Sequence, residues 1–172
     1  VATGSRAFIP PIPGLADVPY LTNETIFSTP EFPKHLIVLG GGPIGLELAQ
    51  AFGRLGAKVT VIEMGRALAR ADEGHAKLAA DTIRGEGVTI LEQHKAARVS
   101  GAAGSITVHA EGPGGEVAVQ GSHLLVALGR RAVLDGLDLD KGRVAHTPTG
   151  ITVGDTLRSK SNPRVWALGD RV

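Results

Sequence analysis

One run of residues constrains this chain more than any other, because it reads as strand, glycine loop, helix, strand and acid in that order. The apolar run 36–39 is followed by GxGxxG spacing at Gly40, Gly42 and Gly45. The first glycine permits a tight turn, the second lets phosphate oxygens approach the backbone, and the third lets the helix pack closely on the sheet. Glu63 ends the next predicted strand, where a carboxylate can accept hydrogen bonds from a ribose diol. The run predicts a dinucleotide-binding βαβ unit, and the alternative is a glycine turn that binds nothing.

The start of the predicted helix adds to this anion site. Backbone N–H groups in the first turn of a helix have no intrahelical acceptor, and the helix dipole is positive there. Pro43 stands at the first helical position, where its missing N–H would have no partner in any case. We therefore expect one continuous segment to hold a pyrophosphate, namely Gly40, Gly41, Gly42, Pro43, Ile44 and Gly45.

Composition excludes several classes of function. The net charge of +1 and the aromatic content of 3% argue against a nucleic-acid partner, which requires a basic or base-stacking surface. No apolar run approaches the ~18 residues of a membrane span, so we expect no membrane partner. Cysteine is absent, which excludes disulfides, thiolate metal sites and thiol catalysis within these residues. The histidines show no i, i+4 spacing, and we expect no metal site.

The order of apolar segments predicts an α/β fold: a Rossmann-like βαβαβ parallel sheet with an inserted antiparallel β-meander. The parallel part is expected in strands 36–39, 58–63 and 88–91, with helices over 43–55 and 72–85. Glycine-rich turns separate three short strands that are typical of a meander, at 97–99, 105–110 and 116–120. The later apolar runs predict a strand that returns to the main sheet and two further strands, at 123–128, 151–153 and 165–168.

Proline content divides the chain into parts. Prolines spread over residues 1–33 exclude regular helix over most of this stretch, so we expect an extended connection, with one helical turn or a short strand as the alternatives in 22–28. Residues 34–160 are expected to form a nicotinamide-dinucleotide-binding domain, and 161–172 a return segment. The chain begins at Val1 without a methionine, and we expect it to be a piece of a longer protein.

Four ordered motifs span nearly the whole chain, and with them it resembles the central domain of the FAD-dependent pyridine nucleotide–disulfide oxidoreductases. This family includes dihydrolipoamide dehydrogenase, mercuric reductase and glutathione reductase. The motifs are Ala2-Thr3-Gly4-Ser5, Gly40 to Glu47 with Glu63, Ala127-Leu128-Gly129-Arg130, and Ala167-Leu168-Gly169-Asp170. The resemblance implies that the first motif marks where the chain leaves an FAD domain and the last marks where it returns.

The resemblance also implies roles for individual residues. Gly129 would contact the nicotinamide end of the cofactor, and Lys95 would border the adenine. The FAD would be contacted by Thr3, Gly4 and Ser5 at the flavin nucleotide and by Asp170 at the ribityl chain.

Glu47 is the one candidate catalytic residue. The resemblance implies that it pairs with a lysine of an FAD domain near flavin N5, where an ion pair would tune the flavin. The alternative is a solvated glutamate on a helix. The chain departs from the family pattern at two places. Pro43 occupies the place of a gating tyrosine in glutathione reductase relatives, so a tyrosine lid over the flavin is not expected. The run Arg130-Arg131-Ala132 lacks the proline that commonly follows in this family, which leaves the local loop path open.

The choice of nicotinamide cofactor depends on Glu63. A carboxylate accepts hydrogen bonds from a ribose diol and repels a 2′-phosphate, so the sequence favours NAD over NADP. Arg66 and Arg70 follow closely and could instead accommodate a 2′-phosphate.

The resemblance implies hydride transfer between NAD(P)H and FAD in a disulfide oxidoreductase, with FAD held by the full-length protein. We expect these 172 residues to bind the cofactor without turnover, because the redox cysteines are absent from them. The expected partners are the FAD and dimerisation domains of the same chain, in a cytoplasmic homodimer. The alternatives are a flavin NAD(P)H oxidase or peroxidase, a ferredoxin reductase, and a stand-alone nucleotide-sensing module.

Overall fold

The computed structural model describes residues 1–169, and they form two compact units. The large unit is Ile9–Gly129. The small unit joins Val1–Phe8 to the residues from Arg130 onward. The predicted division into 1–33, 34–160 and 161–172 concerns the path of the chain relative to a further domain, and it stays a prediction.

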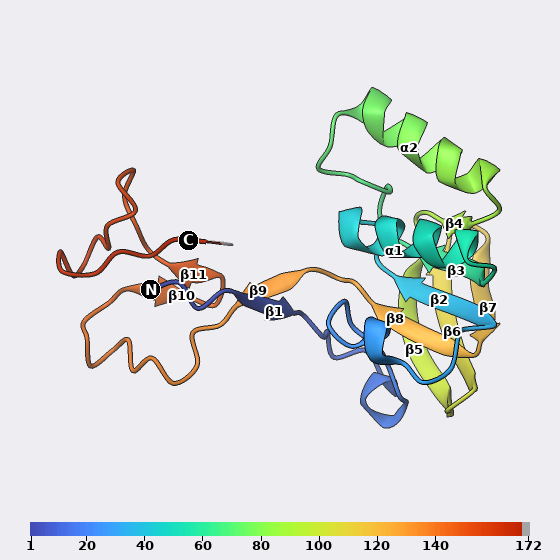
Figure 1. Ribbon diagram of the computed structural model, residues 1–172, viewed down its shortest axis with the longest axis horizontal. Helices are drawn as coiled ribbons and strands as arrows, with labels where there is room; N and C mark the ends of the chain where they lie inside the picture. Colours follow the sequence, from blue (N-terminus) through green and yellow to red (C-terminus); the bar gives the residue numbers. More distant parts are fainter. Residues whose placement is uncertain (170–172) are drawn as a thin grey trace. The chain divides into compact units, whose positions relative to one another are not determined.

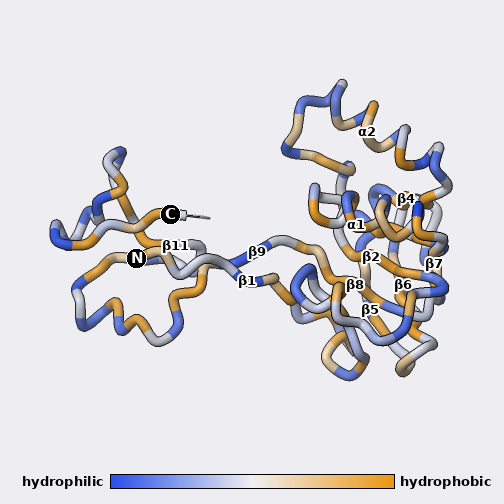
Figure 2. Tube along the Cα trace, viewed as in Figure 1, coloured by the Kyte–Doolittle hydropathy of each residue, from blue (hydrophilic) through white to orange (hydrophobic). Residues whose placement is uncertain are grey.

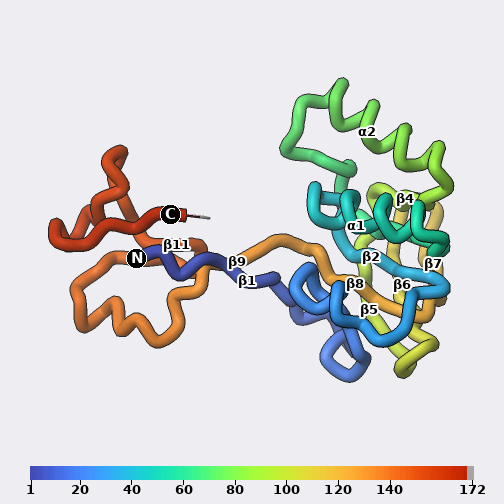
Figure 3. Tube along the Cα trace, in the orientation of Figure 1, coloured from blue at the N-terminus to red at the C-terminus, as the bar shows by residue number. Residues whose placement is uncertain are grey.

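A four-stranded parallel sheet forms the centre of the large unit (Figure 1). Its strand order is β4-β3-β2-β8, with β2 His35–Leu39, β3 Lys58–Ile62, β4 Thr89–Leu91 and β8 His123–Val126. Figure 3 shows β8 beside β2 although most of the unit separates them in sequence, and Leu36 is opposite both Val59 and His123. This order matches half of a doubly wound sheet and confirms the predicted α/β class.

Both faces of the sheet are covered, which explains why its strands are continuous apolar runs. Leu36, Ile37 and Val38 have no exposed surface although successive side chains point to opposite faces. Figure 2 shows hydrophobic residues along β2 and β8. Each face therefore needs its own covering layer.

Two helices belong to one layer. Helix α1, Pro43–Arg54, begins with proline in its first turn and buries Leu46, Ala49 and Phe52. These residues share a cluster with Leu36, Val38 and Leu125 of the sheet. Helix α2, Glu73–Gly85, is capped by Asp72, whose carboxylate accepts the His75 N–H at 3.1 Å. Both helices lie where the sequence predicted them.

The antiparallel meander covers the opposite face. It comprises β5 Lys95–Ala102, β6 Ser105–Gly112 and β7 Gly115–Gly121 in the order β5-β6-β7. Its Ile106 and Val108 are buried in one cluster with Ile37 and Leu124 of the parallel sheet. The predicted inserted meander is confirmed, and its strands extend further than the sequence indicated.

Residues 9–33 pack within the large unit. They contain two 3₁₀ turns, η1 Leu15–Asp17 and η2 Ile26–Ser28, and Leu15 and Ile26 are each only 1% exposed. The predicted helical turn within 22–28 is confirmed by η2. A parallel bridge from Leu21 to Leu125 extends the sheet edge beside β8. This segment is therefore part of the core of the large unit.

The small unit contains short strand pairs. Strand β1, Ser5–Ala7, pairs antiparallel with β9, Arg130–Ala132, and β10, His146–Thr147, pairs with β11, Gly150–Ile151. Its buried cluster consists of Leu139, Val144, Ile151 and Ala167. The backbone N–H of Leu168 donates to the Val1 carbonyl at 3.1 Å.

Two strand predictions here were wrong in detail. Residues 165–168 form no strand; Trp166 makes one isolated bridge to Arg158. Val165 and Ala167 face the core while Trp166 is 47% exposed, so the apolar alternation is present without a long neighbouring strand to pair with. Strand β11 ends at Ile151, and Val153 makes only an isolated bridge to Ser159.

Candidate functional site

The three spaced glycines of the loop between β2 and α1 have different surroundings. Gly40 has φ +107°, and a Cβ there would lie 2.4 Å from the Ala127 carbonyl oxygen. A Cβ on Gly45 would lie 2.0 Å from the Gly40 carbonyl oxygen, so helix and loop could not approach this closely with any other residue. A Cβ on Gly42 would meet nothing within 4 Å. The tight turn and the close packing are thus present, and the space beside Gly42 is open.

The first turn of α1 presents unpaired hydrogen-bond donors next to that open space. The Leu46 N–H donates to the Gly42 carbonyl at 3.0 Å and begins the helical ladder. Within residues 1–169, the N–H groups of Gly42, Ile44 and Gly45 have no hydrogen-bond acceptor. Donors of this kind at the positive end of a helix dipole bind anions. The loop therefore has both the space and the donors that a phosphate group requires.

Glu63 follows β3 and is held against this loop. Its Oε2 accepts the Gly41 N–H at 2.6 Å, and its Oε1 accepts the Gly65 N–H at 2.8 Å. An ionised carboxylate has about four acceptor positions, so about two remain for another donor. The sequence predicted an acid near the loop, and the structure adds that the same carboxylate organises the loop backbone.

The segment after Glu63 closes over the other side of the loop. Leu68, at φ +53°, donates its N–H to the Gly41 carbonyl at 2.9 Å. Both polar groups of the Gly41 backbone are thus bonded to the segment 63–68. Arg66 lies in this segment, and its Nη1 atom is buried without a hydrogen-bond partner in the described chain. Arg70 is exposed.

Three of the predicted sites of the large unit follow the carboxyl ends of parallel strands. The glycine loop follows β2, Glu63 follows β3 and Gly129 lies beyond β8, so all three are at the sheet edge where doubly wound folds bind ligands. Lys95 begins β5 shortly after β4 and is exposed. Glu47 is exposed on α1, and residues 1–169 offer it no hydrogen bond or ion pair.

In the small unit, the first and third motifs are hydrogen-bonded to each other. The Thr3 hydroxyl donates to the Val133 carbonyl at 2.5 Å, and the Val133 N–H donates to the Gly4 carbonyl at 2.9 Å. Arg130 Nε donates to the Ser5 hydroxyl oxygen at 2.7 Å. Asp170 lies outside the described residues. The path after Gly129, which the missing proline left open, is the extended strand β9.

Comparison with known proteins decides the family. The sequence model named "Pyridine nucleotide-disulphide oxidoreductase" matches residues 1–172, the whole chain. The chain belongs to this family. Mercuric reductase from Streptomyces lividans is 39% identical over 99% of the chain, and the probable pyridine nucleotide-disulfide oxidoreductase RclA from Escherichia coli is 33% identical over 99%. The chain spans 36% and 38% of these relatives, respectively.

Solved structures of the family share the fold. The HOCl-induced flavoprotein disulfide reductase RclA from Escherichia coli superposes with a TM-score of 0.86 at 32% identity, covering 98% of this chain and 38% of that one. LpdA from Mycobacterium tuberculosis gives a TM-score of 0.82 at 27% identity, covering 98% and 36%. The resemblance stated from the motifs is therefore confirmed. Family members depend on a flavin and a pyridine nucleotide, and in residues 1–169 no helix is long and apolar enough to cross a membrane.

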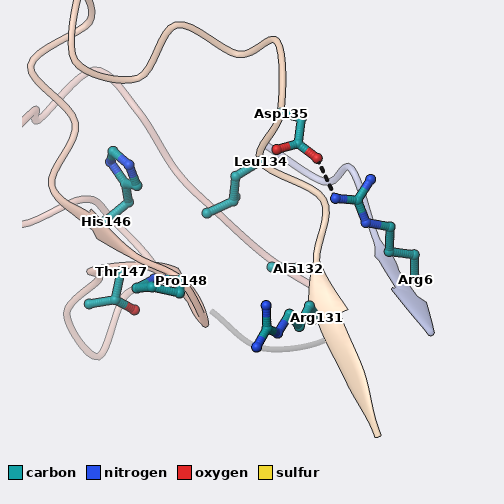
Figure 4. Close-up of a pocket in the computed structure, with 8 residues that line it drawn as sticks. All are labelled: Arg6, Arg131, Ala132, Leu134, Asp135, His146, Thr147 and Pro148. Atoms are coloured by element: carbon teal, nitrogen blue, oxygen red, sulfur yellow. Dashed lines mark ion pairs between the residues drawn. The ribbon is translucent and has the colours of Figure 1, made fainter. Parts of the chain in front are cut away.

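A surface concavity of about 400 Å³ lies in the small unit of this family member (Figure 4). Arg6 on its rim is 2.7 Å from Asp135 in an exposed ion pair, and the Arg131 guanidinium lies 3.8 Å from the centre of the Phe8 ring. None of the residues that the sequence singled out for a cofactor lines it. The concavity is therefore lined by residues other than those of the glycine-loop site.

Two contacts near the sites were missed by sequence reasoning. Arg130 was noted only as part of a motif, and its bond to Ser5 spans 125 positions. Glu92 was not considered, yet its Oε1 accepts the Ala67 N–H at 2.7 Å beside the glycine loop. No local pattern distinguishes Glu92 from a solvated glutamate, so only the fold could reveal it.

Proposed function

We propose that the large unit binds the pyrophosphate of a nicotinamide dinucleotide on the loop 40–45. The observation that carries this proposal is the open space at Gly42 together with the unpaired N–H groups of Gly42, Ile44 and Gly45. Glu63 would accept hydrogen bonds from the adenosine ribose with the lone pairs that Gly41 and Gly65 leave free. When bound, the nicotinamide supplies a hydride for the flavin of the family.

The proposed cofactor is NAD rather than NADP. A 2′-phosphate beside the Glu63 carboxylate would meet like-charge repulsion, whereas a diol would donate to it. Charge-assisted hydrogen bonds contribute about 1.5–3 kcal/mol, which is roughly a ten- to hundredfold preference. Arg66, whose Nη1 lacks a partner, is the feature that favours the alternative, since a guanidinium near this turn can face a 2′-phosphate.

We further propose that the chain acts within a longer flavin-dependent disulfide oxidoreductase. It spans 36% of the mercuric reductase it resembles, which supports the proposal that an FAD domain belongs to the same protein. That domain would contact Thr3, Gly4, Ser5 and Asp170, and would supply a lysine for the exposed Glu47. Gly129 would face the nicotinamide and Lys95 the adenine. The 172 residues alone would bind cofactor without turnover.

The disulfide-reducing branch is preferred to a flavin oxidase, peroxidase or ferredoxin reductase because the relatives carry the names mercuric reductase and disulfide reductase. For the longer protein we propose a cytoplasmic homodimer. A stand-alone nucleotide-sensing module is the second candidate, and it shares the glycine-loop site.

The test is titration of the chain with NADH by isothermal calorimetry, using two glycine variants. Gly42→Ala adds a methyl group where nothing lies within 4 Å, so it should leave thermal stability unchanged while it weakens NADH binding by about tenfold or more. Gly114→Ala is the matched control, since its Cβ is equally open but lies in the β6–β7 turn. Absence of saturable NADH binding in the wild type, or unchanged binding in Gly42→Ala, would contradict the proposal.

A further inference from the structure

Glu92 lies just after β4, and its two carboxylate oxygens accept hydrogen bonds from two different parts of the chain. Its Oε1 accepts the Ala67 N–H at 2.7 Å, and its Oε2 accepts Arg84 Nη2 of α2 at 2.7 Å. The Glu92 side chain is 30% exposed and that of Arg84 is 35% exposed. This partial burial makes the pair less screened than the exposed ion pairs elsewhere on the chain. Glu92 therefore links helix α2 to the segment that follows β3.

Ala67 stands directly before the residue that contacts the glycine loop. It is 1% exposed, and the next residue, Leu68, adopts φ +53°, a conformation that a leucine rarely adopts unless its surroundings hold it. The Leu68 N–H donates to the Gly41 carbonyl at 2.9 Å. The bond from Ala67 to Glu92 therefore anchors the segment at the point where its backbone turns toward the loop.

The same segment is anchored at its beginning by Glu63. Glu63 accepts from Gly65 with one oxygen and from Gly41 with the other. The backbone after β4 reinforces this end, because the N–H of Gln93 donates to the Gly65 carbonyl at 2.9 Å. Gly41 thus donates its N–H to Glu63 at the start of the segment 63–68 and accepts the Leu68 N–H at its end. At this second end, Glu92 supplies the only side-chain acceptor that residues 1–169 provide.

We propose that Glu92 is a positioning residue for the dinucleotide site: through Ala67 and Leu68 it sets the conformation of Gly41, and Arg84 holds its carboxylate in place. This inference rests on the proposed function of the glycine loop and extends it to residues that touch no cofactor. Removal of the Glu92 carboxylate leaves the Ala67 N–H without its acceptor and releases the strained turn at Leu68. The loop then samples conformations in which the unpaired N–H groups of Gly42 and Ile44 are no longer held beside the open space at Gly42, and cofactor affinity falls.

The experiment measures NADH binding to the chain by calorimetry for the wild type, Glu92→Ala and Glu92→Gln. Glu92→Ala should weaken binding by about tenfold, the effect of one lost charge-assisted hydrogen bond. Glu92→Gln keeps an oxygen that can accept the Ala67 N–H and should recover part of that loss. Glu116→Ala is the matched control, because the Glu116 carboxylate also has two partners, His109 at 2.8 Å and Arg98 at 3.2 Å, but lies on the meander. It should bind NADH like the wild type.

A second measurement does not depend on the cofactor. In the ligand-free chain, the amide NMR resonances of Gly41 and Leu68 should shift in Glu92→Ala and remain in place in Glu116→Ala. If Glu92→Ala unfolds, Arg84→Met provides the test, since it frees the Glu92 carboxylate while keeping an aliphatic side chain on α2.

The outcomes separate this inference from the proposed function. Wild-type protein that fails to bind NADH contradicts the proposed function, and the glycine amide resonances still decide whether Glu92 positions the loop. Wild-type protein that binds NADH, with a folded Glu92→Ala that binds it equally well and shows unshifted Gly41 and Leu68 amides, overturns the inference.

Discussion

The two compact units differ in what holds them together. In the large unit, parallel strands with fully buried residues such as Ile37 and Leu125 are covered on both faces. In the small unit, the described strands are two or three residues long and the buried cluster is Leu139, Val144, Ile151 and Ala167. Trp166 and Leu168 remain about half exposed there. The glycine loop thus belongs to the unit with extensive burial, which suits a site that must hold donors in place.

The largest expected effect is a loss of stability on truncating a buried side chain, compared between the cores of the two units. Leu125→Ala, on β8, should lower the free energy of unfolding by about 2–5 kcal/mol, because it removes a fully buried side chain and leaves a cavity. Ile151→Ala, on β11, should reduce hydrogen-exchange protection in the small unit while protection in β2, β3 and β8 is retained. The measurement is amide hydrogen exchange with chemical denaturation. Equal loss of protection in both units after either substitution would show that they unfold as one.

The next effect compares a glycine of each unit. Gly45→Ala places a Cβ 2.0 Å from the Gly40 carbonyl oxygen and should destabilise the large unit by about 1–3 kcal/mol through overpacking. Gly4→Ala, at φ +69° with nothing within 4 Å, should cost only about 1 kcal/mol for its left-handed backbone. Thermal unfolding measures both variants. A larger loss of stability in Gly4→Ala than in Gly45→Ala would contradict this comparison.

A third prediction concerns the carboxylates of the two units. Glu63→Ala should weaken NADH binding by about tenfold to a hundredfold and NADPH binding less, because it removes the proposed ribose acceptor and the acceptor for Gly41. Asp135→Ala removes an exposed ion pair with Arg6 in the small unit and should leave both affinities unchanged. Parallel titrations with the two cofactors provide the test. A wild type that binds NADPH more tightly than NADH would reverse the cofactor assignment and favour Arg66 as the residue that faces the 2′-phosphate.

The smallest effect concerns pH and the large unit alone. Burial at the start of β2, with the Lys58 charge nearby, lowers the pKa of His35 below its ordinary value of 6.5. As pH falls, His35 therefore takes up a proton at a higher pH in the unfolded chain than in the folded chain. The stability that this difference contributes is present above about pH 6.5 and is lost as pH falls below it. His35→Gln, which can still bond with Thr60, should show a weaker fall in melting temperature between pH 7 and pH 5, about the range in which histidine titrates.

Prediction from sequence succeeded where the signal is local. The apolar run 36–39 became β2, His35–Leu39, and the predicted helix 43–55 became α1, Pro43–Arg54, because periodicity and capping depend on residues within one turn or strand. The sequence did not predict β1 and β9. These short strands show no apolar alternation, and their pairing joins Ser5 to Ala132, which are far apart in the sequence. The apolar alternation at 165–168 was correct about which side chains are buried and wrong about a strand, because a strand also needs a partner.

The candidate site divides in the same way. The spacing of Gly40, Gly42 and Gly45 and the acid at Glu63 were apparent before any fold was known, because steric limits on backbone conformation act within a few residues. That Glu63 bonds the Gly41 backbone, and that Glu92 joins Arg84 to Ala67, depended on three separate loops meeting at one edge of the sheet. Hydrogen-bond partners distant in sequence are selected by packing of the whole unit, so only the tertiary structure could assign them.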